Sequence, residues 1–164
     1  PDLCSNIEII VIDDCSTDNS ENEIKKIKDT RIRYIKLRKR KGANYARNRG
    51  ILKASGEFIS FLDSDDTFFY NKLKKQINNI KKEKSDFDFC KIFIQVNYPY
   101  NTNFILPNDK QEKSIIKGEI FEELTKGNFI STQSILVKKQ IIEKIFFDEN
   151  LPRFQDYDFL LRIL

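Results

Sequence analysis

Two clusters of carboxylates follow segments of the sequence that are typical of buried strands. Asp13 and Asp14 come directly after the apolar run 7–12, and an Asp-Ser-Asp-Asp stretch at 63–66 follows the run 57–62. Taken alone, either cluster is equally well explained as the cap of a following helix, because Asp and Ser accept hydrogen bonds from the free N–H groups there. Carboxylates that lie close together repel one another unless a cation or a donor compensates. Together, the two clusters predict a site for a hard divalent cation and a phosphate-bearing ligand.

The elements that would position these carboxylates alternate between strand-like and helix-like patterns. Strands are indicated at 7–12, 33–37 and 57–62, and helices from the loop 13–20 to about 29, at 43–54 and at 69–82. This alternation predicts an α/β fold, with a Rossmann-like, mostly parallel sheet, right-handed crossovers and flanking helices. Ligands of such sheets bind beyond the carboxyl ends of the strands, which is where both acidic clusters fall.

The pattern is looser beyond residue 86. We expect strands at 87–96 and 134–137, a loop or hairpin at 97–113, and helices at 117–125, 138–145 and from 155 onward. Residues 1–164 are expected to form a single domain that is truncated at both ends. The first strand has no strand–helix unit before it, and the last helix stops while Phe159, Leu160 and Ile163 still require a core.

Composition excludes several classes of function. The chain has 164 residues, of which 40% are hydrophobic and 33% charged, as is typical of a globular domain. It contains no histidine, which excludes Ser/His/Asp and Cys/His catalysis and imidazole-bound metals within this sequence. Cys4, Cys15 and Cys90 are widely spaced, which indicates free thiols in a reducing, cytoplasmic compartment. No apolar run approaches the roughly 20 residues of a membrane helix.

The net charge of +4 is unevenly distributed. Residues 24–53 contain thirteen Lys or Arg and one acid, Asp29, whereas residues 143–158 contain five acids and two bases. A basic run of this kind is either a set of solvated element faces or a surface that attracts phosphates or anionic lipid. The second interpretation would allow peripheral association with the inner face of the cytoplasmic membrane. Nucleic acid is not expected as a partner, because aromatic residues are not interleaved with the charges.

Three blocks of the sequence resemble the family 2 glycosyltransferases, which have a GT-A fold. They are EIIVIDDCSTDNS, KGANYARNRGILKASGEFISFLDSDD and RFQDYDFLLRI, in the family's order. The resemblance implies an inverting enzyme that moves a sugar from a nucleoside-diphosphate sugar, UDP-linked by preference, to a hydroxyl. It also implies a glycan or lipid-linked acceptor, a role in bacterial surface polysaccharide assembly, and a divalent cation, Mn²⁺ or Mg²⁺.

The resemblance also implies roles for particular residues in binding the donor. Asp14, with Asp13 beside it, matches the acid that contacts the nucleotide base, where a carboxylate accepts the imide N–H of uracil. Asp63 and Asp65 match a D-x-D motif, whose last acid binds the metal and whose first acid faces the ribose or the metal's waters. Arg47 matches a block that contacts the donor diphosphate or the D-x-D loop. The alternative for Arg47 is an ion pair with a strand-end acid on a helix that merely packs beside the pocket.

On the acceptor side, the resemblance implies that Asp156 is the catalytic base that removes a proton from the acceptor hydroxyl. The alternative is a carboxylate that stabilises the start of a helix through its dipole. Asp158 is expected to be structural. Gln133, Phe154 and Tyr157 are candidates for shaping an acceptor site, with a place in the core as the alternative.

The sequence departs from the family pattern in three places. The family's first strand and the continuation after the catalytic helix are not present, and Cys15 stands where a glycine is common. We therefore retain a non-catalytic domain that binds nucleotide sugar or glycan as a second hypothesis. A sugar-phosphate nucleotidyltransferase is a third and weaker hypothesis, because the glycine-rich, arginine-containing loop of those enzymes is missing.

Overall fold

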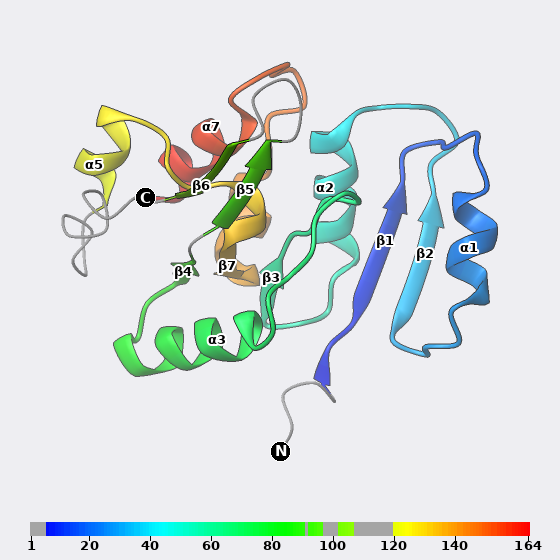
Figure 1. The fold of residues 1–164 in the computed structure, drawn as a ribbon, viewed down its shortest axis with the longest axis horizontal. Coiled ribbons are helices and arrows are strands. Elements are labelled where there is room, and N and C mark those ends of the chain that lie inside the picture. Colours follow the sequence, from blue (N-terminus) through cyan, green and yellow to red (C-terminus); the bar gives the residue numbers. More distant parts are fainter. Residues whose placement is uncertain (1–5, 91, 97–101, 107–119) are drawn as a thin grey trace.

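The computed structural model describes residues 6–90, 92–96, 102–106 and 120–164. Its first unit is a parallel pair of strands, β1 (Ile9–Asp13) and β2 (Ile32–Lys36), joined by helix α1 (Ser20–Lys26). Ile9 lies opposite Ile32 and Asp13 opposite Lys36. Figure 1 shows this unit at one side of the molecule, with helix α2 (Ala43–Lys53) between it and the remaining elements. The parallel pairing expected for the first two strands is confirmed.

The second sheet contains β3 (Phe58–Ser60), β7 (Ile135–Lys138) and β4 (Phe87–Phe89) in that spatial order. β7 is the central strand and runs antiparallel to both of its neighbours. Helix α3 (Lys72–Glu83) connects β3 to β4 and packs against β4. The α/β class is confirmed, but β3 does not pair with a strand close to it in sequence. A strand from late in the chain enters beside it in the opposite direction, so the pairing in this sheet is antiparallel.

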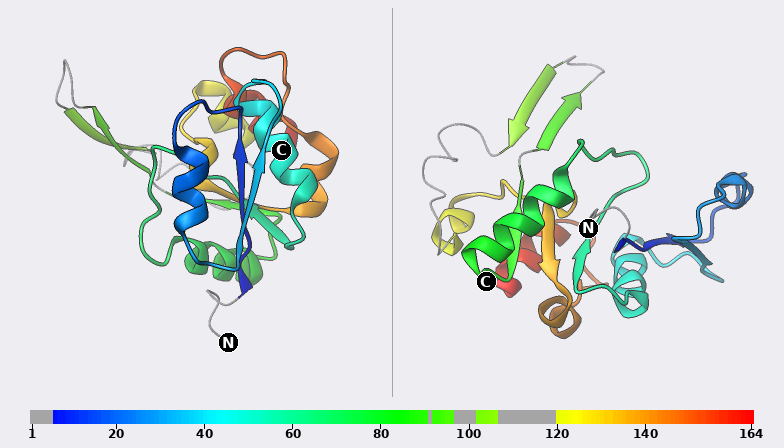
Figure 2. Two further views of the ribbon diagram at one scale, coloured as in Figure 1. Left: turned by 90° about the vertical axis from the view of Figure 1, so that its right-hand side faces the viewer. Right: turned by 90° about the horizontal axis from the view of Figure 1, so that it is seen from below.

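The expected strand at 87–96 is divided into two. β4 ends at Phe89, the backbone N–H of Cys90 donates to the Ser134 carbonyl, and β5 (Ile92–Val96) then leaves this sheet. β5 pairs antiparallel with β6 (Thr102–Leu106), and this hairpin projects from the body of the molecule (Figure 2). A hairpin was one of the two structures expected for 97–113, of which 97–101 and 107–113 lie outside the described residues.

The core lies between the second sheet and the C-terminal helices. β7 contributes three buried side chains, Ile135, Leu136 and Val137. Helices α5 (Phe121–Lys126), α6 (Lys139–Ile145) and α7 (Gln155–Ile163) contribute Leu124, Ile142, Phe159 and Leu160, all of which are at most 1% exposed. The rings of Phe147 and Phe159 stack with their centroids 4.0 Å apart. Phe159 and Leu160, for which the sequence required a core, have one here.

Among the helices that the structure describes, none has both the length and the apolar character that crossing a membrane would require.

Candidate functional site

Asp13 ends β1, and its carboxylate is used by the loop that follows. It is 7% exposed, and its two oxygens accept hydrogen bonds from the Ser16 backbone N–H (2.7 Å) and from the Tyr34 hydroxyl. Burial alone would raise the pKa of Asp13, but these hydrogen bonds and the nearby charge of Lys36 hold the pKa below its usual value. Burial and the Asp13 carboxylate raise the pKa of Tyr34. Asp13 is therefore an ionised residue whose two carboxylate oxygens both hold the backbone and side chains around the end of β1.

Asp14 joins the end of β1 to the segment that leads into α2. One carboxylate oxygen accepts from the backbone N–H of Lys41 and the other from that of Gly42, each at 2.7 Å. Gly42 has φ +91°, a conformation that side chains disfavour, so glycine suits this position. Cys15, directly after Asp14, has φ +65°. The left-handed backbone explains why glycine would be common at that position in the resembled family.

Arg47 on α2 connects the second and third sequence blocks. Its Nη2 donates to both oxygens of Asp63, at 3.0 and 3.1 Å, and its Nη1 donates to Gln155 Oε1 at 3.3 Å. Gln133 donates from Nε2 to Asp63 Oδ2 at 2.9 Å. The guanidinium also lies 5.5 Å from the centre of the Phe147 ring. We call these four polar residues, Arg47, Asp63, Gln133 and Gln155, the arginine junction.

Asp65 lies in the same tight turn as Asp63 but is free. The turn is closed by a hydrogen bond from the Asp66 N–H to the Asp63 carbonyl (3.1 Å). Asp65 is exposed, and within the described part of the chain its side chain has no hydrogen-bond or ion-pair partner. No group of three or more acidic or thiol ligands occurs among the described residues. Two carboxylates on one turn nevertheless suit Mg²⁺ or Mn²⁺, because such cations take their remaining ligands from phosphates and water.

Asp156 lies in the first turn of α7, directly after the junction residue Gln155. Within the described ranges of the chain, its Oδ1 accepts a single, local hydrogen bond, from the Tyr157 N–H at 2.9 Å. Asp158 accepts from Arg162 at 2.5 Å, and Arg162 also donates to the carbonyls of Ile145 and Phe146 at the end of α6. Asp158 therefore has the structural place expected of it, while Asp156 lies beside the junction.

The three candidates for an acceptor site have separate places in the structure. Gln133 belongs to the junction through Asp63. Tyr157 donates its hydroxyl to the Leu124 carbonyl at 2.8 Å and packs against the core, as its alternative interpretation required. Phe154 is 73% exposed and has φ +57° immediately before α7.

Sequence reasoning missed Gln155 and the amide side chains that hold α2 to the α6–α7 connection. Asn48 exchanges two hydrogen bonds with the Phe147 backbone, at 2.9 and 2.8 Å. Asn44 donates to the Asp148 carbonyl at 2.6 Å. Their spacing was a signal in the sequence. Residues 44, 47 and 48 lie on the same face of the helix as the buried Ile51, so polar side chains there indicate partners within the protein.

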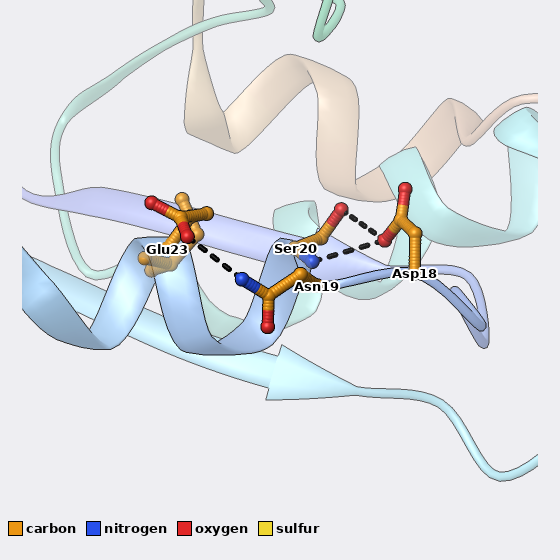
Figure 3. A pocket seen from close by; sticks show the side chains of 5 residues that line it. Asp18, Asn19, Ser20 and Glu23 are labelled. Carbon is orange, nitrogen blue, oxygen red and sulfur yellow. Dashed lines mark hydrogen bonds between the residues drawn. The ribbon is translucent and has the colours of Figure 1, made fainter.

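Neither of two open depressions in the described surface is lined by a residue of the arginine junction. One, of about 440 Å³, is lined by Asp18, Asn19, Ser20, Glu23 and Ile24 at the start of α1 (Figure 3). There Asp18 accepts from both the N–H and the hydroxyl of Ser20, and Asn19 donates to Glu23. Asp18 thus accepts the N–H of the first residue of α1, while Asn19 at the N-cap makes no capping hydrogen bond with its side chain. The other, of about 430 Å³, is lined by Asn48, Leu52 and residues 146–150.

A known family matches most of this chain. The family model described as Glycosyl transferase family 2 matches residues 3–146. The chain belongs to this family. The match includes Asp14, Arg47, Asp63 and Asp65 and ends before Asp156. The family resemblance read from the three sequence blocks is thereby confirmed, and glycosyl transfer is favoured over nucleotidyl transfer.

The chain is also similar to curated proteins that are named as glycosyltransferases. The chain is 34% identical over 95% of its length to an uncharacterized glycosyltransferase of Methanocaldococcus jannaschii, of which it covers 53%. It is 39% identical over 68% of its length to an Escherichia coli protein named UDP-Glc:alpha-D-GlcNAc-diphosphoundecaprenol beta-1,3-glucosyltransferase, of which it covers 45%. This glycosyltransferase chain thus spans about half the length of the curated relatives it matches.

The GT-A fold is supported by a solved structure. The crystal structure of residues 1–349 of S. aureus TarS matches 97% of this chain with a TM-score of 0.72, at 24% sequence identity. The match covers 46% of the TarS chain. At this identity the likeness establishes the fold, which agrees with the α/β class expected from the sequence.

Proposed function

We propose that this glycosyltransferase moves a sugar from a UDP-sugar to a hydroxyl of a lipid-linked glycan acceptor, with inversion at the anomeric carbon. The observation that supports the proposal most is the arginine junction. Through Arg47 it connects Asp63, at the far end of the same sequence block, with Gln155 in the third block, although 108 positions separate Arg47 from Gln155. Capping of individual helices does not require such a convergence.

On the donor side, the proposal assigns the base to Asp14 and the metal to Asp65, with Asp63 beside it. Asp63 is oriented by Arg47 and Gln133, which leaves Asp65 as the carboxylate available to a cation. A bound Mn²⁺ or Mg²⁺ would neutralise negative charge that develops on the departing diphosphate. Arg47 is held by Asp63 and Gln155 and therefore positions the D-x-D turn.

On the acceptor side, the proposal assigns Asp156 as the base. Its carboxylate is partly exposed and, in the described residues, engaged only by the adjacent N–H of Tyr157. It would accept the proton of the acceptor hydroxyl as the oxygen attacks the anomeric carbon from the face opposite the diphosphate. One such displacement inverts the configuration.

Donor binding is tested by calorimetric titration of UDP, GDP and dTDP with and without Mn²⁺. We expect Mn²⁺-dependent binding that prefers UDP, and loss of that dependence in Asp65→Asn. The matched control is Asp66→Asn. It removes the same charge from the residue that directly follows Asp65 and lies outside the D-x-D motif. Equal behaviour of the two variants, or UDP binding unaffected by metal, would overturn the donor assignment.

Turnover is tested with the substrates named for the E. coli relative, UDP-glucose and GlcNAc-diphosphoundecaprenol. Asp156→Asn is expected to lower turnover by roughly 10²–10⁴-fold, the usual contribution of general-base catalysis, and to leave UDP affinity unchanged. Asp158→Asn, with the same charge change on the same helix, is the control. Absence of turnover with any UDP-sugar, together with intact UDP binding, would instead favour the non-catalytic binding domain.

A further inference from the structure

Most of the basic residues in the first unit of the fold are neutralised by neighbouring acids. Lys25 and Lys36 contact Glu21, Lys26 contacts Glu23, Arg31 contacts Asp29, and Arg33 lies 3.6 Å from Glu8. Arg47 is paired with Asp63. The charges of these side chains are therefore balanced by carboxylates next to them.

The segment between β2 and α2 is different. Arg38, Lys39, Arg40 and Lys41 are consecutive and exposed, and we call them the cationic loop. The sequence has no acid between Asp29 and Glu57. Within the part of the chain that the structure describes, no carboxylate forms an ion pair with any of these four side chains. The nearest contact is that of Lys41 Nζ, 5.9 Å from the centre of the Tyr45 ring. This loop is therefore a run of uncompensated positive charge, and the exposed Lys74, Lys75 and Lys81 of α3 form another one elsewhere in the described structure.

The cationic loop has a fixed place relative to the site. Asp14 holds the backbone N–H groups of Lys41 and Gly42, and α2, which starts directly after the loop, carries Arg47. Figure 1 shows the segment between β2 and α2 at the top of the view, at the same end of the molecule as the connection between α6 and α7. The loop therefore lies at the end of the molecule where Gln155 and Asp156 begin α7.

We propose that the cationic loop docks this protein on an anionic phospholipid surface. The four side chains belong to one short exposed segment, and no described acid pairs with them. They can therefore contact several separate phosphates that lie in a plane, as at a membrane surface. A single diphosphate would require converging donors, and the backbone N–H groups of Lys41 and Gly42 are already occupied by Asp14. Each Lys or Arg near an anionic membrane strengthens binding by about fivefold. The proposal concerns where the protein works and does not depend on which sugar it transfers.

The test is sedimentation of the protein with phosphatidylglycerol/phosphatidylethanolamine vesicles and with phosphatidylcholine vesicles. We expect binding only to the phosphatidylglycerol vesicles, weakening as salt rises. Replacing all four loop residues (Arg38→Gln, Lys39→Gln, Arg40→Gln, Lys41→Gln) is expected to weaken binding by roughly 100-fold or more, since four residues at about fivefold each would give about 600-fold. The control replaces Lys74, Lys75, Lys81 and Lys82, exposed on α3, by Gln and so removes the same charge. It is expected to change binding by less than about threefold.

Three results would overturn the proposal: no binding to anionic vesicles, equal weakening in both four-fold variants, or full binding by the loop variant. Circular dichroism melts verify that both variants are folded. UDP titration of the loop variant separates this proposal from donor binding. A loop variant that loses UDP affinity but still binds vesicles would assign the loop to the nucleotide phosphates instead. Loss of vesicle binding with intact UDP affinity supports the membrane and leaves the proposed function standing.

Discussion

Arg47 joins three segments through one guanidinium. Its side chain is 14% exposed, it contacts Asp63 and Gln155, and its buried Nε has no hydrogen-bond partner in the described structure. Removing the guanidinium would leave Asp63 without its paired charge and Gln155 Oε1 without its donor. Lysine cannot replace it, because a single ammonium group lacks the planar fork that reaches both acceptors.

We expect Arg47→Ala to lower the free energy of unfolding by about 1–3 kcal/mol, the usual result of leaving partly buried polar partners unsatisfied. Arg47→Lys is expected to recover less than half of that loss. Urea unfolding measures both variants. The control is Arg49→Ala, which removes an exposed guanidinium from the same helix, where it contacts only Tyr45. If the arginine junction did not stabilise the fold, Arg47→Ala and Arg49→Ala would lower the free energy of unfolding equally.

Lys72 is a residue whose environment opposes its own charge. Burial lowers the pKa of Lys72 to about 8, although Cys90 and Asp88 act in the opposite direction. The ammonium donates to Ser60 Oγ at 3.1 Å and lies 4.2 Å from the centre of the Phe68 ring. Because the unfolded chain holds this proton up to a higher pH than the folded chain does, stability should rise as pH increases through 8.

Lys72→Met is therefore expected to be more stable than the unchanged protein at neutral pH, by about 1 kcal/mol after allowance for partial solvent screening. The difference should shrink as the pH is raised past 8, where the folded lysine becomes neutral. Chemical unfolding at pH values on both sides of 8 measures it. Lys74→Met, at an exposed position of the same helix, should show no such trend. A pH-independent difference for Lys72→Met would contradict the assignment.

At the scale of elements, α2 is held by side chains that mimic a backbone ladder. Asn48 is 6% exposed and bonds both the N–H and the C=O of Phe147. Asn48→Ala would leave two buried backbone groups unsatisfied and is expected to lower the free energy of unfolding by roughly 2–3 kcal/mol. Asn78→Ala, on the exposed face of α3, is the control and should be close to neutral. Urea unfolding of both variants measures this difference, and equal free energies of unfolding would show that the Asn48 hydrogen bonds do not stabilise the fold.

The elements were largely predictable from sequence, but their partners were not. Hydrophobic patterns located α3 and the first three strands to within a few residues, because that signal is local, whereas α2 was located by residues that suit a helix before Ser55 and Gly56. The pairing of Ser60 with Leu136 is not local, and nothing in either segment specifies it. Of the candidate site, the acids and Arg47 could be found because a motif places them. Gln155 could not, because a neutral amide acquires its role only when the fold brings Arg47 beside it.

At the scale of the whole molecule, the described residues form a core and an attached outer unit. The cluster of buried apolar side chains draws on α2, β3, β7 and the C-terminal helices, and has no member in β1, α1 or β2. Helix α1 has no buried residue at all. The outer unit is therefore held by the β1–β2 ladder, by the contact of β1 with α2, and by a few polar links such as Asp14.

Native-state hydrogen exchange should resolve this division. We expect backbone amides of α1 and β2 to exchange through local opening, with lower protection than amides of β7 and α7, since few buried contacts oppose their release. Mass spectrometry of peptic fragments provides the comparison within one sample. Equal protection in β2 and β7 would mean that the chain opens only as a whole.

The two hydrogen bonds of Asp14 have a thermodynamic consequence. The carboxylate that holds the start of α2 is the one assigned to the nucleotide base, so a base that approaches along the directions used by the N–H groups of Lys41 and Gly42 would displace them. A ligand that displaces these N–H groups would loosen the cationic loop. By reciprocity, any surface that pulls this segment outward makes the carboxylate easier to capture. Binding of a nucleotide at Asp14 and binding of a surface by the cationic loop would then each change the affinity of the other, without any rearrangement of the core.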